Sequence, residues 1–299
     1  MMDINFKRNL PKNTTGNSNE PPICTTIKVL GSKVDITKYP PMGDIYIIFS
    51  NITGFNKSNF ILTNGCEEAM GIVCRAVKPK MISLSTPTWG FIDVLSNQYD
   101  ILLDKHNFVY DLDEDIIVCD DTNLPLKGDM IYCNQEYNNW FKTRDYTNNI
   151  VEYGETIVND FTYLNIFEES TINKIRKALS NNQIIVGSLS KFFGAGIRLG
   201  FIIANDYMFN KYKFEIFRPN FLNSLVYPVL RYYSKNTPKI KNKYMDFYSY
   251  ESIVTNHFSY ISTLSKNIIS DKYVKLKIKE KGSITNEEIV VNRYSKALK

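Results

Sequence analysis

The sequence has few of the residues that build metal centres or disulfide frameworks. Only two of its 299 residues are histidines, His106 and His257, and neither belongs to a recognisable catalytic or metal-binding motif. The five cysteines are odd in number and lack metal-ligand spacing; they are Cys24, Cys66, Cys74, Cys119 and Cys133. Scattered cysteines in a chain of this length are typical of a reducing cytoplasm. We therefore expect a cytoplasmic protein with neither a zinc site nor a disulfide framework.

Long apolar runs and strong charge of one sign are also missing. No apolar run approaches the roughly 18 residues needed to cross a bilayer, and the N-terminus lacks the apolar core of a signal peptide. The net charge is only +5, and the lysine-rich region after Ser234 contains little arginine and no nucleic-acid recognition motif. We therefore expect neither a membrane nor a nucleic acid as a partner.

What the sequence does contain is an alternation of apolar runs with amphipathic segments. Strand-like runs occur at 60–63, 81–86, 100–103, 129–134, 156–160, 183–189 and 198–205, and helical periodicity occurs at 67–77 and 171–179. This alternation predicts an α/β fold with a mostly parallel sheet covered by helices on both faces. In such sheets, ligands bind at the carboxyl ends of the strands. Beyond residue 206 we expect a helix over 207–217 and a terminal helix over 285–299, with Thr285 as its N-cap.

Several chemically unusual residues follow the predicted strands. Strand 60–63 leads through Asn64 and Gly65 into a helix that begins near Cys66, and such a turn presents free backbone N–H groups to an anion. Trp89 follows strand 81–86, where an aromatic ring either joins the core or stacks on a flat ligand. Cys66 lies where a helix N-terminus could activate its thiol.

The next two strands end in charged residues. Asp160 closes strand 156–160 and needs a cationic partner if it is buried, and Tyr163 follows it. Lys191 follows Ser188 and Ser190 and precedes a glycine-containing turn with Arg198. Lys191 is either a strand-end lysine that reaches solvent or an amine held in a pocket for covalent chemistry.

A single ligand, pyridoxal 5'-phosphate (PLP), would use all of these groups. Lys191 would form an imine with its aldehyde, Asp160 would keep the ring nitrogen protonated, and Tyr163 would hydrogen-bond the phenolic oxygen. Trp89 would pack on the ring. The phosphate would bind the backbone N–H groups of Gly65, Cys66 and Glu67 and the side chains of Ser188, Ser190 and Arg198.

These same segments carry a resemblance to a known family. TNGCEEAM (63–70), STPTWGFIDV (85–94), VNDFTY (158–163) and SLSKFFGAGIRLGF (188–201) resemble the class I/II aminotransferases of PLP fold type I, within their histidinol-phosphate aminotransferase-like branch. The resemblance implies an N-terminal arm at 1–34, a large PLP-binding domain at 35–230 and a reduced small domain at 231–299. The segment KYPP (38–41) implies that Tyr39 reaches the phosphate in the partner subunit of a homodimer. At the position of Cys66, the family's side chain is a bystander.

Two departures from the family pattern concern ligand binding. The Asn-Pro-Thr-Gly turn, whose asparagine contacts the phenolic oxygen, is replaced by YCNQEYNNW (132–140), where Asn134 is preferred over Asn138. The arginine that binds the substrate carboxylate is missing, and Lys275 or Lys277 stands at the best-matching segment, KYVKLKIKEKG (272–282). A lysine lacks the bidentate fork of arginine.

The sequence therefore predicts a cytoplasmic, biosynthetic aminotransferase that uses a Lys191 Schiff base. It would act on an amino acid or amino-alcohol phosphate and a 2-oxo acid. Two alternatives stay open: a PLP-dependent decarboxylase of an amino-acid phosphate, and a degenerate PLP-binding protein without transaminase activity. A dinucleotide loop at GAGIRLG (194–200) does not fit, because these glycines precede a strand instead of opening a helix.

Overall fold

The structure is a computed structural model that describes most of the central part of the chain. It describes residues 39–86, 88–111, 116–119, 128–134, 156–162, 164, 166–190, 195–245, 273–280 and 283–292. At 108–111, 116–119, 134, 195, 236–245, 273–280 and 283–292 only the backbone is described.

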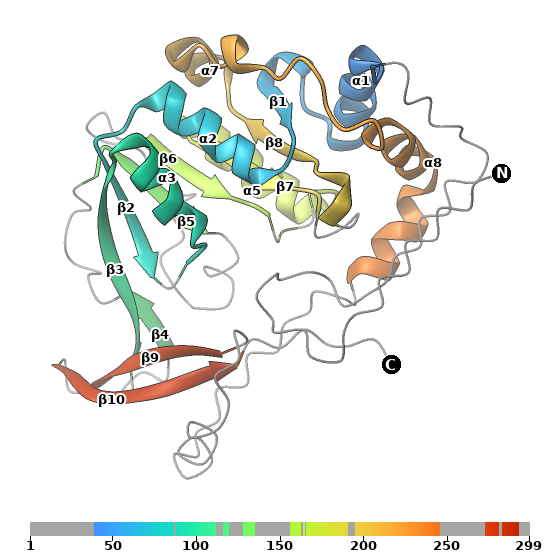
Figure 1. Ribbon diagram of the computed structural model, residues 1–299. Coiled ribbons are helices and arrows are strands. Elements are labelled where there is room, and N and C mark those ends of the chain that lie inside the picture. Colours follow the sequence, from blue (N-terminus) through green and yellow to red (C-terminus); the bar gives the residue numbers. More distant parts are fainter. Residues whose placement is uncertain are drawn as a thin grey trace.

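Ten strands form one continuous sheet (Figure 1). They are β1 (Phe60–Thr63), β2 (Met81–Thr86), β3 (Leu102–Asp111), β4 (Ile116–Cys119), β5 (Met130–Asn134), β6 (Thr156–Asp160), β7 (Ile184–Ser188), β8 (Gly200–Ile203), β9 (Tyr273–Glu280) and β10 (Ser283–Asn292). The order is β1-β8-β7-β6-β5-β2-β3-β9-β10, with β4 paired to β3. Strands β7, β6, β5, β2 and β3 run parallel, whereas β8 is antiparallel to both β1 and β7.

Helices cover both faces of the central sheet (Figure 1). They are α1 (Met42–Thr53), α2 (Cys66–Val77), α3 (Phe91–Tyr99), α5 (Glu169–Ser180), α7 (Asp206–Tyr212) and α8 (Val226–Met245), with short 3-10 turns η2 (Lys57–Asn59), η4 (Ala195–Ile197) and η5 (Phe214–Phe217). Alternation along β1 directs Phe60 and Leu62 to the core under α1, α5 and α8, and Ile61 to the core under α2, α3 and α7. These two layers confirm the predicted α/β fold with a mostly parallel sheet.

The predicted helical periodicities match the observed helices α2 and α5. In α2, Ala69, Met70 and Val73 are fully buried on one face, as their spacing predicts. In α5, Ile172 and Ile175 are buried, and Leu179 packs against the same core. The predicted strands at 60–63, 81–86 and 156–160 are confirmed with the same bounds.

Three predictions about secondary structure need correction. The strand expected at 100–103 begins at Leu102, because Asp100 takes a left-handed conformation (φ 52°) that ends α3. The helix expected over 207–217 is interrupted in the same way at Lys213 (φ 51°), between α7 and η5.

The expected terminal helix with Thr285 as N-cap is wrong, because 283–292 forms strand β10. Its β-branched run Ile289–Val291 pairs antiparallel with Val274–Leu276 of β9, and the register places Glu288 opposite Lys277. β-Branched residues favour an extended backbone, and pairing with a distant strand outweighs the acidic residues that suggested a helix start.

Within the described part of the chain, no helix combines the length and apolarity that a membrane crossing requires.

Candidate functional site

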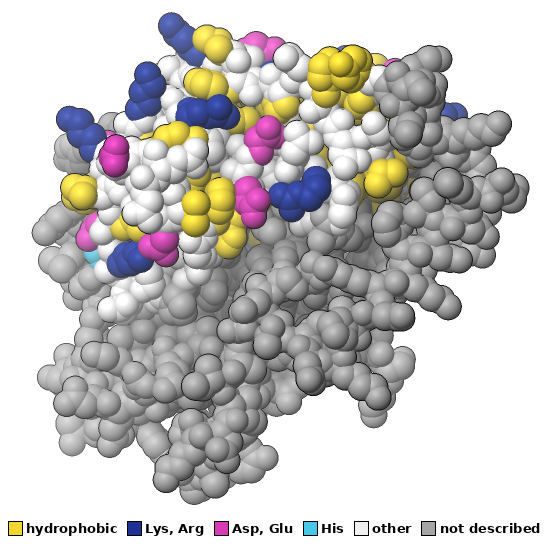
Figure 2. All heavy atoms as spheres, in the orientation of Figure 1, with side chains coloured by type: hydrophobic (Ala, Val, Ile, Leu, Met, Phe, Trp, Pro, Cys, Tyr) yellow, Lys and Arg dark blue, Asp and Glu magenta, His cyan; other side chains and the backbone are white. Residues whose placement is uncertain are grey.

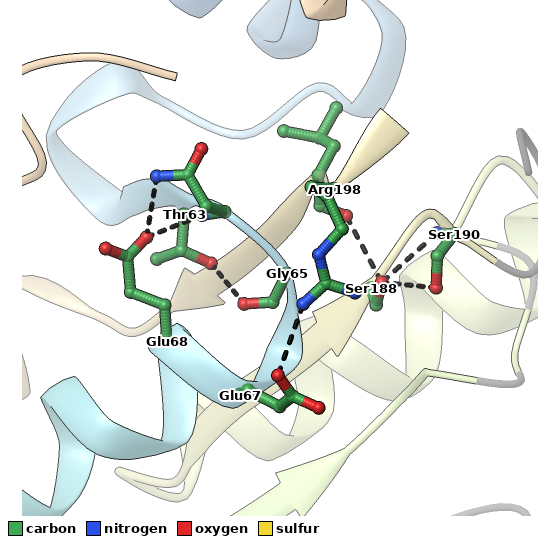
Figure 3. Close-up of polar contacts among 9 residues, drawn as sticks. Thr63, Gly65, Glu67, Glu68, Ser188, Ser190 and Arg198 are labelled. Atoms are coloured by element: carbon green, nitrogen blue, oxygen red, sulfur yellow. Dashed lines mark hydrogen bonds and ion pairs between the residues drawn. The ribbon is translucent and has the colours of Figure 1, made fainter. Parts of the chain in front are cut away.

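The antiparallel direction of β8 brings an arginine to the carboxyl edge of the sheet. The first residue of β8, Gly200, lies opposite Thr63 at the end of β1 and opposite Ser188 at the end of β7. The turn before β8 therefore lies at the edge where β1 and β7 end, and it carries Arg198. Figure 3 shows the Arg198 side chain extending past Gly65 toward the start of α2.

Two glycines allow this close approach. Gly65 has a left-handed φ of 100°, and a Cβ there would lie 2.6 Å from Arg198 Nη2. A Cβ on Gly200 would lie 2.4 Å from the carbonyl carbon of Gly65. Because contacts this short do not occur between packed atoms, both positions require glycine if the arginine is to lie against the turn. Thr63 Oγ1 fixes the turn further by donating to Gly65 O at 2.9 Å.

Arg198 is held in an uncommon backbone conformation. Its φ of 50° lies in the left-handed region, which costs a non-glycine residue about 1 to 2 kcal/mol. The guanidinium forms an ion pair of 3.4 Å with Glu67, but side-chain exposures of 44% and 55% make that pair weak. On the face visible in Figure 2, acidic, basic and apolar side chains are interspersed over the helices. The described side chains on that face therefore form no broad basic patch.

Two buried serines fix the end of β7 beside this turn. Ser188 Oγ lies 2.8 Å from Ser190 Oγ and accepts from the Ser190 backbone N–H at 3.1 Å (Figure 3). Leu189 donates its backbone N–H to Leu199 O, which ties the two segments together. Lys191, the next residue, lies outside the described residues, and so does Tyr163.

Asp160 is buried at the end of β6, with 4% of its surface exposed. Its Oδ2 accepts from the Tyr132 hydroxyl at 2.7 Å, and its Oδ1 accepts from the Thr162 backbone N–H at 2.8 Å. The Cys66 Sγ lies 4.0 Å from the same Oδ1. Donors on both oxygens stabilise the negative charge, so the site can hold a carboxylate inside an apolar wall.

Cys66 is not an activated nucleophile. Burial, followed by the negative charge of Asp160, raises the pKa of the Cys66 thiol well above its usual value. The thiol therefore stays protonated at neutral pH, although it lies in the first turn of α2, where the helix N-terminus favours a thiolate. Cys66 can therefore contribute its backbone N–H to an anion site, whereas its thiol cannot, and no side chain caps the start of α2.

The two predicted aromatic ligands have different surroundings. Trp89 is partly buried just beyond β2 and packs on Phe91 with ring centroids 5.0 Å apart. Tyr39 is 74% exposed and stacks on Phe221 of its own chain at 3.9 Å. The Phe221 carbonyl accepts from Asn64 Nδ2 at 3.4 Å, so this exposed stack adjoins the turn at Gly65.

The remaining predicted ligands are placed only by their backbones. Asn134 ends β5, and the register pairs it with Asp160. Lys275 and Lys277 lie on β9. This strand pairs in parallel with β3, and the register places Lys277 opposite Val109. The described residues at this edge include Gly65, Cys66, Glu67, Asp160, Ser188, Ser190 and Arg198, and Trp89 follows the end of β2 at the same edge of the sheet.

Two buried hydroxyls at this edge also have no ordinary hydrogen-bond partner among the described residues. They belong to Thr88, beside Trp89, and Thr162, which follows Asp160 and lies against the Cys66 thiol. The Thr162 hydroxyl is placed to hydrogen-bond the Cys66 thiol, so the Thr88 hydroxyl is the one that indicates a place where a polar ligand fits. The described residues contain no group of three potential metal ligands.

Comparison with curated proteins identifies relatives of the chain. No family model matches it. Histidinol-phosphate aminotransferase from Pyrococcus furiosus is 24% identical over 66% of this chain, and the match spans 58% of the length of that relative. The histidinol-phosphate aminotransferase from Clostridium kluyveri is also 24% identical, over 89% of this chain and 86% of its own length. The chain is therefore similar to these aminotransferases at low identity.

Solved structures show the same fold. Histidinol-phosphate aminotransferase from Clostridium acetobutylicum superposes with a TM-score of 0.51 and 14% identity, covering 71% of this chain and 65% of that one. The L-threonine-O-3-phosphate decarboxylase from Porphyromonas gingivalis gives 0.50 and 13%, covering 87% and 88%. The predicted fold type I architecture of the aminotransferase homologues is therefore confirmed.

Sequence reasoning assigned no role to Tyr132, although its position on β5 carries a signal. Tyr132 and Asn134 share one face of the strand, and β5 pairs in parallel with β6. A tyrosine in a buried strand needs a partner for its hydroxyl, and the parallel neighbour β6 ends in the carboxylate of Asp160. The roles of Thr88 and Thr162 had no comparable signal, because threonine is common beyond strand ends.

Proposed function

We propose that the chain binds PLP at this edge and transfers amino groups with it. The observation that carries the proposal is the placement of Arg198 against Gly65 at the start of α2. It supplies a guanidinium, two strand-end hydroxyls and uncapped backbone N–H groups for a phosphate, while a buried carboxylate ends the neighbouring strand β6.

The residues present fit such a cofactor. Arg198, Ser188, Ser190 and the backbone N–H groups from Gly65 to Glu67 would hold the phosphate, and Asp160 would bind the protonated ring nitrogen. Thr88 offers a buried hydroxyl that has no partner among the described residues. Lys191 would hold the cofactor covalently, with Trp89, Tyr163 and Asn134 completing the set.

When bound, PLP withdraws electrons from the substrate carbon that carries the amine. The chain's own residues would direct this chemistry. Asp160, which is buried and accepts two hydrogen bonds, would supply a negative charge that favours a proton on the ring nitrogen. Lys191 would act as a positioned general base. It would take a proton from the substrate carbon that carries the amine and deliver it to the carbon on the other side of the amine nitrogen. The apolar core under α2 and α3 excludes water from one side of the site.

The substrate and assembly are finer parts of the proposal. The donor would be an amino acid or an amino-alcohol phosphate, and the acceptor a 2-oxo acid, with Lys275 or Lys277 contacting the substrate. We further propose a cytoplasmic homodimer in which Tyr39 contributes to the partner's site. The exposed aromatic stack of Tyr39 on Phe221 offers apolar area for such an interface.

The first experiment is a visible absorbance titration of the purified protein with PLP. Wild type should develop a protein-bound band that Lys191→Ala lacks and that Lys177→Ala, a change at an exposed residue of α5, retains. Addition of amines and 2-oxo acids should then shift the band, and analysis of products should reveal an oxo product. Release of carbon dioxide would assign decarboxylation instead. If wild type with added PLP gave only the spectrum of free PLP, the proposal would be refuted.

A further inference from the structure

The surroundings of Asp160 assemble donors from three separate elements. Tyr132 comes from the middle of β5, Thr162 from the turn after β6, and Cys66 from the first turn of α2. Tyr132 is itself buried, with 3% of its surface exposed, so its hydroxyl needs a partner within the protein. Its bond of 2.7 Å to Asp160 Oδ2 is the short distance typical of a donor to a charged oxygen.

We propose that Tyr132 is a positioning residue that fixes the charged Asp160 carboxylate for the ring nitrogen of the cofactor. This inference rests on the proposed function. The Cys66 thiol supports the same carboxylate from the opposite oxygen. Neither residue would touch the substrate.

The two hydrogen bonds set the plane of the carboxylate. Because Tyr132 donates to Oδ2 and Thr162 N–H donates to Oδ1, rotation about the Cβ–Cγ bond would break both. The Thr162 donor belongs to the backbone and needs no particular side chain. Tyr132 therefore supplies a side-chain donor on the Oδ2 side that favours this orientation of the carboxylate.

The sheet register explains why a tyrosine is needed. Tyr132 lies opposite Val158, two residues before Asp160, whereas Asn134 lies opposite Asp160 itself. A long side chain is required to reach forward from that position to the carboxylate. The apolar ring fills the core under α2, and only its hydroxyl reaches the polar edge.

Charged groups near the Cys66 thiol also bear on this carboxylate. Cys66 faces Asp160 and remains a neutral S–H donor, because its pKa is raised by burial and by Asp160. Glu67 and Arg198, at the start of α2 and before β8, act on Cys66 with opposite signs. Protonated Cys66 can support the carboxylate, whereas a thiolate would repel it.

The test compares two cofactors that differ at one atom. PLP and an analogue with C–H in place of the ring nitrogen are titrated into wild type, Tyr132→Phe, Asp160→Asn and the control Tyr227→Phe, from the partly buried face of α8. Losing one charge-assisted hydrogen bond should weaken PLP binding by about tenfold in Tyr132→Phe. Binding of the carbon analogue should change by less than about twofold, because no ring proton faces Asp160.

The outcomes separate this inference from the proposed function. Equal weakening of both cofactors by Tyr132→Phe, or no weakening of either, would overturn the positioning role. The double variant Tyr132→Phe/Asp160→Asn should bind PLP no worse than Asp160→Asn, and an additive loss would also count against it. If wild type bound neither cofactor, the proposed function itself would fail. Thermal unfolding of Tyr132→Phe well above the titration temperature, as for wild type and Tyr227→Phe, would show that the variant is folded when cofactor binding is measured.

Discussion

The two ends of the candidate site are held in place by different kinds of interaction. The arginine end, which comprises Gly65, Glu67 and Arg198, is partly exposed and depends on backbone shape: two close glycine contacts and one left-handed arginine. The aspartate end, which comprises Asp160, Tyr132 and Cys66, is buried and depends on side-chain hydrogen bonds. Substitutions should therefore change the chain path at the first end and the charge distribution at the second.

The largest expected effect is at the arginine end, where backbone contact is closest. Gly200→Ala would place a Cβ 2.4 Å from the carbonyl carbon of Gly65, so β8 or the turn must move. We expect the free energy of unfolding to fall by roughly 3 kcal/mol, as for other steric conflicts in a core. PLP binding should be lost at the same time. Urea unfolding and the absorbance titration measure the two effects.

The matched control for this change is Gly196→Ala in η4. No atom lies within 4 Å of a Cβ at Gly196, and the residue is exposed. Its substitution should alter unfolding by less than about 0.5 kcal/mol. Equal tolerance of alanine at Gly200 and Gly196 would mean that the close approach of β8 to Gly65 is not required.

A second substitution separates strain from binding at Arg198. Arg198→Gly removes the cost of the left-handed arginine, and the lost ion pair to Glu67 is too exposed to offset it. The free energy of unfolding should therefore rise by about 1 kcal/mol while PLP affinity falls at least tenfold. Arg198→Ala should lose the same affinity without the gain in stability. A stability gain equal in both variants would indicate that the strain lies elsewhere.

The difference between the two ends also shows what the sequence could predict. The fold follows from local patterns, because β1, β2, β6, α2 and α5 each carry their own periodicity. The arginine end was predictable as a motif, since Gly65 and Arg198 stand beside recognisable strand ends. The direction of β8, which brings them together, has no signature in the local sequence.

Long-range pairing accounts for most of what sequence reasoning missed. The β9–β10 hairpin pairs with β3, although Val109 and Lys277 are separated by more than half of the sequence. The acidic residues of β10 resembled the first turn of a helix. The bond of Tyr132 to Asp160 joins residues 28 positions apart and depends on the pairing of β5 with β6. Such contacts are set by register rather than by the residues on either side.

The smallest expected effect concerns the acidic residue at the arginine end. Glu67 forms an ion pair of 3.4 Å with Arg198. In the proposed complex, the Glu67 carboxylate would compete with the cofactor phosphate for the guanidinium. Glu67→Gln should therefore strengthen PLP binding by about threefold, the value of an exposed ion pair. The gain should shrink in 1 M salt, where the screening length falls to about 3 Å.

A suitable control for this charge effect is Glu169→Gln on α5. Glu169 forms a similar exposed pair of 3.3 Å with Arg176, within α5 itself, so PLP affinity should stay unchanged. Weaker binding in Glu67→Gln would mean that the carboxylate orients Arg198 toward the turn instead of competing for it. The arginine end would then depend on side-chain hydrogen bonds as the aspartate end does, and the contrast between the two ends would no longer hold.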